Sequence, residues 1–593
     1  MKDNIIPIFY ACDDNFVKYT IVSLHSMMVN ASKDYRYQIH VLHTNISAEM
    51  QQVMMAMENE NFSVSFENVT AYLDELAGNL PIRDYYSKTT YFRMFIAEMF
   101  PQYDKAIYID SDTIVQGDIS RMYLTDTGDA YLGACHDQAM LQTEQYGSYV
   151  EQVVGVDREF YFNAGVLLIN CQQFRNHKVL EKFNSLLGQY NFVVTQDEDY
   201  LNLICKDWVY WLDQRWNTEV FGVIPYPIEE ADIIHYIMTS KPWHYADCRH
   251  GDIFWKYAAE TQVYKEICQE LESYTDAQRE RDAISCSNLL KLAEDEINRE
   301  DNYQNRLNQS VRAADRVAIL QKIKEYEEAG RFHEDVENDP PSPVLNPEDI
   351  DYLKKGFVGN CKRAIAFAAA YRFFDKLEKS GDVVVRKAEG LEHLAGVEGA
   401  VITCNHFNPM DSFIMQRVFD DSGHPKKLYR VIREGNYTNF PGFYGFLMRN
   451  CNTLPLSSNM QTMKKFLTAV KELLGQGNCI LIYPEQSLWW NYRRPKPMKS
   501  GAFDMAVKNH VPVVPCFITM RDTDKIGADG FPIQEYYPHL GEPIWPDTTL
   551  SKLAAKEKLR QQTEDFCCQV YERVYGVPLD LSSLNTPRET PEE

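Results

Sequence analysis

The chain has 593 residues, 45% of them hydrophobic, 13% aromatic and 24% charged, and its formal net charge is −25. The length exceeds what one hydrophobic core supports, and the composition excludes a disordered chain. The acidic charge argues against a nucleic-acid partner, because neutralising phosphates requires a basic face. The charge is about −28 over residues 1–350, about +9 over 351–510 and about −6 over the remainder, so only the middle segment favours an acidic ligand or an anionic membrane.

The cysteines and the first residues bear on the compartment. The 14 cysteines lack CxxC spacing, which favours a reducing compartment and argues against a structural zinc site. The start, MKDNIIPIFY, lacks the pattern of a signal peptide, and no apolar run approaches the ~20 residues that span a bilayer. We therefore expect a cytoplasmic protein.

The hydrophobic pattern predicts two α/β regions. Apolar runs at 5–12, 37–44 and 105–112 indicate strands with helical stretches between them. A charged, helical pattern follows from about 255 to 337, and a proline-rich break follows at 337–349. Further strands are predicted at 382–387, 399–404, 478–484 and 511–518. We predict four segments: a domain over 1–260, a helical region and linker over 261–348, a second domain over 349–580 and a disordered tail over 581–593.

Asp110 and Asp112 end the apolar run AIYI. In extended backbone, residues two apart point the same way, so both carboxylates can offer oxygen ligands to Mg²⁺ or Mn²⁺. A metal at this position would neutralise a leaving diphosphate. Taken alone, DSDT is also a good turn, and the motif needs its context.

Six motifs supply that context: YACDDN, TTYFRMF, YIDSD, YFNAGVLLIN, QDEDYLN and HYIMTSKPWH. In this order and spacing, the region of about residues 5–260 resembles the family 8 glycosyltransferases. The resemblance implies a GT-A (Rossmann-like) nucleotide-sugar fold and transfer of a hexose from a UDP-sugar with retention of configuration. It implies Mn²⁺, or Mg²⁺, bound by Asp110, Asp112 and His235. It also implies nucleotide-sugar contacts from Ala11, Asp13, Asn15, Arg93, Asn163, Gly165 and Lys241, with Asp197 and Glu198 at the reacting sugar.

Two residues depart from the family pattern. Met238 stands where a glycine commonly approaches the phosphates, and Glu198 stands where a glutamine is frequent. The second change leaves open whether this side chain assists the reaction or shapes the choice of donor.

The second α/β region carries the stretch CNHFNPMDSF. The run before it predicts a buried strand, and Asn408 with Pro409 predicts a helix start. Asp411 then falls in the first turn, where it can hold the imidazole of His406 in one tautomer and make it a general base. The alternative is a helix cap beside an unrelated surface histidine.

Downstream elements favour the catalytic interpretation. YPEQS ends another apolar run, and MKSGAFDMA and VPVVPCF follow it. Together these elements, over about residues 380–560, resemble the lysophospholipid (1-acylglycerol-3-phosphate) acyltransferase family. The resemblance implies an acyltransferase αβ fold in which His406 is the base, Asp411 its partner and Arg433 a support for the oxyanion. Glu485, Ser487, Arg493, Arg494 and Lys499 are the expected acceptor-binding residues.

The acceptor itself is left open. YPEQSL lacks the glycine and arginine usual in the family run, and Ser458 stands near the place of another arginine. One alternative is a phosphorylated acceptor held by Arg493 and Arg494, and the other is an acceptor without phosphate, such as a sugar hydroxyl.

Residues 352–380 are helical in pattern, basic and aromatic, which suits a helix lying in a membrane interface. A core-packing helix with a basic outer face fits equally.

We predict a bifunctional transferase whose partners are a UDP-hexose, an acyl thioester (acyl-CoA or acyl carrier protein) and a lipid or glycan acceptor, with peripheral membrane contact. The competing interpretation keeps the glycosyltransferase active and makes the second domain a catalytically degenerate lipid-binding or anchoring module.

Overall fold

The computed structural model describes residues 4–71, 88–337, 341–579 and 581. The predicted tail, apart from residue 581, and positions 338–340 of the predicted linker lie outside the described residues. The chain divides into two compact units, Met1–Leu307 and Asn308–Glu593. The four predicted segment boundaries stay a prediction.

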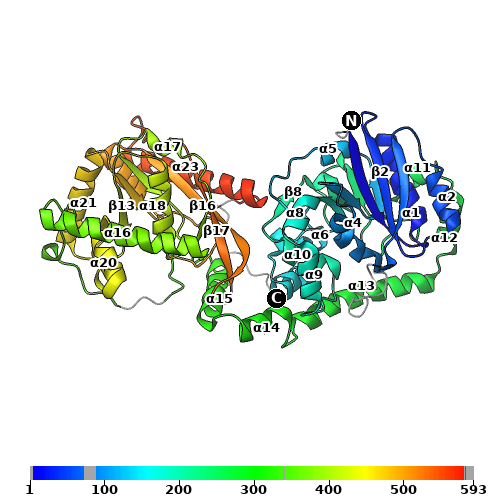
Figure 1. Cartoon of the computed structure of the whole chain (residues 1–593), viewed down its shortest axis with the longest axis horizontal. Helices are drawn as coiled ribbons and strands as arrows, with labels where there is room; N and C mark the ends of the chain where they lie inside the picture. Colours follow the sequence, from blue (N-terminus) through cyan, green and yellow to red (C-terminus); the bar gives the residue numbers. More distant parts are fainter. Residues whose placement is uncertain (1–3, 72–87, 338–340, 580, 582–593) are drawn as a thin grey trace. The chain divides into compact units, whose positions relative to one another are not determined.

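The first unit is built on a seven-stranded sheet with the order β3-β2-β1-β4-β7-β6-β8. Strands β2 and β8 of this sheet are labelled in Figure 1. Its strands are β1 (Ile5–Ala11), β2 (Arg36–His43), β3 (Phe62–Asn68), β4 (Ala106–Ile109), β6 (Leu132–Ala134), β7 (Val166–Ile169) and β8 (Val209–Trp211). β1 runs parallel to β2 and β4, whereas β7 is antiparallel to β4. A small sheet joins β5 (Thr113–Val115), β10 (Ile233–His235) and β9 (Thr218–Glu219).

Both faces of the large sheet are covered. In β4, Tyr108 packs into one buried cluster, while Ile107 and Ile109 pack into the other. Such double burial requires apolar residues at every strand position, which is why AIYI reads as a continuous apolar run. The helices of this unit include α1 (Val17–Asn30), α2 (Ala48–Met55), α4 (Ile96–Met99), α5 (Ile119–Tyr123), α6 (Gln138–Gln142), α7 (Glu144–Tyr149), α8 (Cys171–Asn176), α9 (Val179–Leu187), α10 (Asp197–Cys205), α11 (Gly251–Ala258), α12 (Tyr264–Ser273) and α13 (Asp276–Ile297).

Part of the predicted helical region packs on the first unit. Ile267 of α12 is buried in one of its clusters, and Leu289 and Ala293 of α13 are buried in the other. The next helix in the chain is α14 (Tyr303–Ser310). In contrast, α15 (Ala314–Glu328) belongs to the second unit, where its Ile323 packs against Trp489.

The second unit has its own seven-stranded sheet with the order β11-β17-β16-β12-β15-β13-β14. Its strands are β11 (Val384–Val385), β12 (Ala400–Thr403), β13 (Leu428–Ile432), β14 (Thr453–Pro455), β15 (Cys479–Ile482), β16 (Val513–Ile526) and β17 (Pro532–Leu540). β12 lies parallel to both β15 and β16, and β16 pairs antiparallel with β17. The unit's other helices are α16 (Phe357–Ser380), α17 (Glu392–Ala395), α18 (Asp411–Asp421), α19 (Glu434–Thr438), α20 (Gly442–Asn450), α21 (Met460–Gly475), α22 (Gly501–Asn509) and α23 (Lys552–Tyr575).

The predicted fold class, two different α/β domains, is confirmed. One local prediction is wrong: α18 begins at Asp411 with Met410 as its N-cap, not at Asn408 and Pro409. The Asn408 side chain instead accepts a hydrogen bond from the Met410 amide (3.0 Å), which stabilises a turn before the helix. Among the described residues, no helix is both long and apolar enough to cross a bilayer.

Candidate active sites

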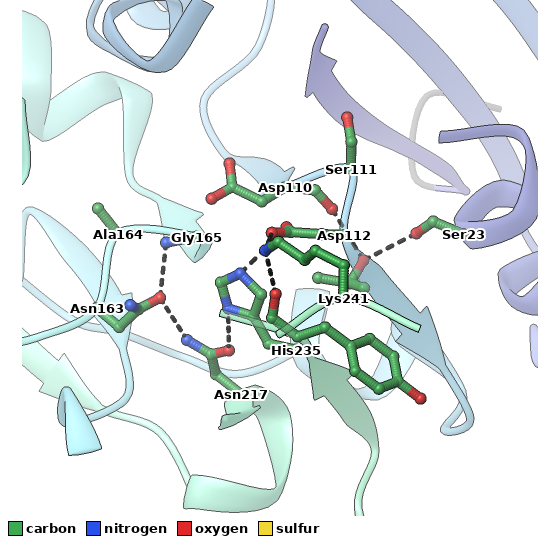
Figure 2. Close-up of polar contacts among 12 residues, drawn as sticks. Ser23, Asp110, Ser111, Asp112, Asn163, Ala164, Gly165, Asn217, His235 and Lys241 are labelled. Atoms are coloured by element: carbon green, nitrogen blue, oxygen red, sulfur yellow. Dashed lines mark hydrogen bonds and ion pairs between the residues drawn. The ribbon is translucent and has the colours of Figure 1, made fainter. Parts of the chain in front are cut away.

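Three potential metal ligands meet in the first unit. Asp110 and Asp112 follow β4, and His235 ends β10 (Figure 2). One ligand atom from each of the three lies within 4.8 Å of the others. The sequence placed the two aspartates together by their spacing, but only the pairing of β10 with β5 brings His235 to them.

The surroundings of His235 suit a divalent cation. Its Nδ1 lies 3.0 Å from Oδ1 of Asn217, so this nitrogen donates and Nε2 keeps its lone pair toward the carboxylates. A Cβ on Gly165 would lie 2.3 Å from the imidazole and 2.8 Å from Oδ2 of Asp110, so only glycine fits against the cluster. Two carboxylates and a neutral imidazole form a donor set that Mn²⁺ accepts, and the residues present fit such an ion. Asn217 was missed by the sequence analysis because nothing local to it marks its role.

Two cations border the same cluster. Lys241 Nζ contacts Oδ2 of Asp112 at 2.6 Å and also donates to the Tyr236 carbonyl. Arg93 is buried, lies 3.0 Å from Asp197 and 3.4 Å from Asp110, and donates to the Ala164 carbonyl. Each can therefore pair with an anionic ligand that enters beside the aspartates.

A cavity of about 230 Å³ opens onto these groups. Its lining brings together most of the predicted nucleotide-sugar and metal residues, namely Ala11, Arg93, Asp110, Asp112, Asn163, Gly165, Asp197, Glu198, His235 and Lys241. Asp13 and Asn15 do not line it. They lie in the turn after β1, where Asp13 accepts the backbone amide of Asn15 at 2.9 Å.

Several carboxyls of this cavity's lining are buried, namely Asp137, Asp197 and Glu198. Burial, with Asp137 nearby, raises the pKa of Glu198 well above its ordinary value, and burial raises the pKa of Asp197 to about 6. Glu219 is also buried, with its pKa raised well above the ordinary value. A protonated Glu198 carries a donor and an acceptor, as glutamine does, and its Oε2 accepts the Ala164 amide at 2.7 Å.

Met238 adopts a left-handed backbone conformation, with φ of 58°. Such a conformation favours glycine, the residue that the family pattern has at this position. Met238 lines the same cavity and holds this backbone conformation at a conformational cost.

In the second unit, His406 and Asp411 form the predicted pair. Nδ1 of His406 lies 2.5 Å from Oδ2 of Asp411, which is buried. The imidazole stacks on the ring of Tyr483 at 4.4 Å between centroids. Asn405 lies beside His406 in the loop after β12 and fixes this loop to β16, because its amide exchanges two hydrogen bonds with the backbone of Ile518 (2.9 and 3.0 Å). Since Nδ1 is engaged, Nε2 is the nitrogen available to take a proton.

Glu485 holds the backbone of the loop that carries His406. It is 2% exposed, and its carboxylate accepts the backbone amides of His406 (3.2 Å) and Lys496 (3.1 Å). The Lys496 ammonium is also buried, 3.7 Å from Glu485 and above the Trp489 ring. Burial raises the pKa of Glu485 and lowers the pKa of Lys496 to about 8.

We expect Glu485→Ala to destabilise the His406 loop by about 3–5 kcal/mol, because it leaves a buried ammonium and two buried amides without their carboxylate. Hydrogen exchange of peptides covering 400–410, measured on the whole chain, reports this change. Asp421→Ala, which removes an exposed carboxylate of the same unit, is the control. Unchanged exchange in Glu485→Ala would rule out the supporting role.

A larger cavity of about 790 Å³ includes His406 and Asp411 in its lining. Much of the remaining lining is apolar, and the side chains come from α16, α18, α20 and α21. They include Phe367, Ala370, Phe374, Phe413, Leu447 and Phe466. Volume and lining together suit an acyl chain better than a polar ligand.

The other predicted residues of this unit separate into two groups. Arg433 and Lys499 line the cavity. Arg433 is paired with Asp335, whose two oxygens lie 2.6 and 2.8 Å from the guanidinium. Glu485, Ser487, Arg493 and Arg494 do not line it. Arg493 pairs with Asp522 and Arg494 with Glu327 (2.8 and 2.7 Å), while Ser487 donates to the Phe332 carbonyl. His333 and Asp335, which the sequence analysis did not select, line the cavity instead.

Comparison with known proteins gives each unit a class. Residues 7–247 match the model of Glycosyl transferase family 8, and residues 385–519 match the model described as Acyltransferase. Both are families of group-transfer enzymes. The chain thus carries a family 8 glycosyltransferase domain followed by an acyltransferase domain, and the prediction of two enzyme domains is confirmed.

Several relatives are named as glycosyltransferases. A putative glycosyltransferase of Haemophilus influenzae is 27% identical over 269 residues, or 42% of this chain and 77% of the relative. The lipopolysaccharide 1,3-galactosyltransferase of Salmonella typhimurium is 26% identical over 249 residues, or 40% of this chain and 72% of the relative. The solved galactosyltransferase LgtC, in complex with donor and acceptor sugar analogs, is 28% identical and covers 43% of this chain and 96% of its own, with a TM-score of 0.38.

Proposed function

We propose that the protein is a bifunctional transferase. Its first domain transfers a hexose from a UDP-sugar with retention of configuration and depends on a divalent metal. Its second domain transfers an acyl group from a thioester to a hydroxyl of a lipid or glycan. The observation that carries the proposal is that each family-matched domain has the groups its chemistry needs on one cavity: the carboxylate–imidazole cluster in the first and the His406–Asp411 pair in the second.

In the first domain, Asp110, Asp112 and His235 would hold Mn²⁺, which when bound would supply positive charge to a diphosphate leaving group. Lys241 and Arg93 contact the diphosphate and the donor sugar, and Asn163, Asp197 and Glu198 surround the sugar. Glu198, whose pKa is raised well above its ordinary value by burial, orients a sugar hydroxyl by hydrogen bonding.

In the second domain, Nε2 of His406 takes the proton of the acceptor hydroxyl while that oxygen attacks the thioester carbonyl. The new C–O bond becomes the ester bond of the product, and the C–S bond of the thioester breaks. The imidazolium returns its proton to the departing sulfur. Asp411 stabilises the imidazolium, and the apolar part of the cavity holds the acyl chain.

Parallel assays on one preparation test the proposal: UDP release from UDP-glucose and UDP-galactose, and thiol release from acyl-CoA and acyl carrier protein. Both assays use a total glycolipid extract as acceptor. We expect metal-dependent UDP release and thiol release that rises with the extract. UDP release without any thiol release would support the alternative, in which the second domain is a degenerate lipid-binding module.

The two activities in one chain favour a shared route to a glycolipid or an acylated glycan, because tethering raises the effective concentration of one domain's product at the other. The product of each domain is therefore tested as the acceptor of the other. If neither product serves as the other domain's acceptor at any concentration, the two activities do not share a route.

We also propose that α16 contacts a membrane surface. Its residues Phe357, Val358 and Ile365 are 82%, 65% and 61% exposed, and the exposed Lys362 and Arg372 lie on the same helix. Apolar side chains beside basic ones suit the interface of an anionic bilayer.

For the double variant Phe357→Glu and Ile365→Glu, we expect binding to phosphatidylglycerol vesicles to fall at least about tenfold. Each apolar side chain that leaves water for the bilayer contributes about 1.5–3 kcal/mol to the free energy of binding. Vesicle co-sedimentation measures the change. Leu553→Glu, at a 71% exposed position on α23, is the matched control. Equal binding by the double variant and the wild type would remove α16 from the contact.

A further inference from the structure

A segment that precedes the acyltransferase match forms part of the wall of the His406 cavity. Residues 331–337 are anchored by Phe332 and Val336, which are buried against Trp489. Their backbone is held as well: Oγ of Ser487 donates to the Phe332 carbonyl (2.8 Å), and Nε1 of Trp489 donates to the Glu334 carbonyl (2.9 Å). From this held segment, His333, Asp335 and Glu337 line the cavity.

Asp335 pairs with Arg433, one of the arginines that line this cavity, through both terminal nitrogens of the guanidinium group. Its Oδ2 accepts from Nη1 of Arg433 at 2.8 Å, and its Oδ1 accepts from Nη2 at 2.6 Å. Nη2 also donates to the Gln486 carbonyl at 2.8 Å. This parallel, two-bond geometry is the one by which arginine recognises a phosphate. The carboxylate of Asp335 therefore occupies the position that a phosphate would need.

Outside the Asp335–Arg433 pair, the cavity lining carries three cations, Arg417, Arg430 and Lys499, and three carboxylates, so it has no net positive charge. Arg417 is paired with Asp375 and Glu378, and the buried Arg430 donates to the Gln416 side chain at 2.6 Å. Arg493 and Arg494 lie outside the lining and are paired with Asp522 and Glu327. His333 adds no charge at neutral pH, because burial and the nearby Lys499 lower its pKa. Lys499 is a single exposed cation, and the carboxylates Glu337 and Asp504 in the same lining offset its charge.

We infer that Asp335 determines the acceptor of the acyl transfer. By holding Arg433, it excludes acceptors that carry a phosphate beside the reacting hydroxyl and leaves the cavity to neutral polyhydroxyl acceptors, such as the sugar of a glycolipid. Carboxylates and carbonyls at this wall accept hydrogen bonds from sugar hydroxyls but repel a phosphate. The inference rests on the proposed acyl transfer.

The test compares two acceptors with the whole chain and acyl-CoA: a dodecyl hexoside, which is neutral, and lysophosphatidate, which carries a phosphate. Product formation gives kcat/KM for each. We expect the wild type to favour the hexoside at least about tenfold. In Asp335→Asn, the ratio should shift toward lysophosphatidate by about 10–100-fold, mainly through KM, because Arg433 can then pair with the phosphate. The combination of Asp335→Asn with Arg433→Gln should lose that shift.

Glu334→Gln is the matched control, since Glu334 lies next in the chain but pairs with Arg331. It should keep the wild-type ratio. A wild type that favours lysophosphatidate would overturn the inference, and this comparison needs no variant to fold. An unchanged ratio in an Asp335→Asn protein with wild-type thermal unfolding would also overturn it, while His406-dependent transfer would leave the proposed function intact. Absence of His406-dependent thiol release with every acceptor would refute the acyl transfer and the inference together.

Discussion

Replacing His406 by alanine is expected to lower acyl transfer by about 10²–10⁴-fold, the range that a positioned general base contributes. The imidazole is the group that lies on the cavity with one nitrogen engaged by a buried carboxylate and the other available. Its loss leaves the attacking hydroxyl without a proton acceptor. The measurement is kcat/KM for thiol release from acyl-CoA at saturating acceptor.

Asp411→Asn is expected to lower the same rate by about 10²-fold or more, because an amide can hold the ring in the wrong tautomer and cannot stabilise the imidazolium. His424→Ala is the control for both variants. Its histidine lies in the same unit, with Nε2 on the Val397 carbonyl at 2.7 Å, away from the cavity lining. Thiol release that persists in His406→Ala at the wild-type rate would exclude base catalysis by this residue.

Removing the metal is expected to abolish sugar transfer from a UDP-hexose. In the first domain, Asp112→Ala should lower UDP release by about 10²–10³-fold, since a divalent ion supplies several kcal/mol of stabilisation to the developing charge. Treatment with EDTA should have the same effect on the wild type, and Mn²⁺ should restore activity. Direct titration of Mn²⁺ by calorimetry provides a readout that does not depend on turnover.

Asp129→Asn is the control, because Asp129 is an exposed carboxylate of the same unit outside the cluster. It should bind Mn²⁺ and release UDP as the wild type does. Full UDP release in the presence of EDTA, or unchanged Mn²⁺ affinity in Asp112→Ala, would contradict the assignment of the cluster as a catalytic metal site.

Much of each site could be predicted from the sequence, because its chemistry is encoded over short distances. Asp110 and Asp112 follow a fully apolar strand, and His406 and Asp411 join a strand to a helix across five residues. In both cases strand burial and local geometry are enough to bring the pair together. The helix start two residues later than predicted did not disturb the second pair, because Asp411 still lies in the first turn.

The partners of these pairs were decided by tertiary structure. Asn217 orients His235 only because β9 and β10 are neighbours in a small sheet. The motif predicts Glu485 as an acceptor-binding residue. In the structure, the loop after β15 turns its carboxylate inward, where it accepts hydrogen bonds from two backbone amides. Arg493 and Arg494 are predicted to bind the acceptor, with a phosphate as one of two alternatives, and in the structure they pair with carboxylates from other elements.

The sequence by itself thus determined the two α/β domains, the strands that present the sites and the residue pairs that are close along the chain. Tertiary structure alone decided which cations are neutralised and which segment completes the His406 cavity. Asp335 reaches Arg433 across 98 positions, and nothing in the composition or periodicity of either stretch encodes that contact. A charge's partner depends on which loops the packed core brings together, and that packing is a property of the whole unit.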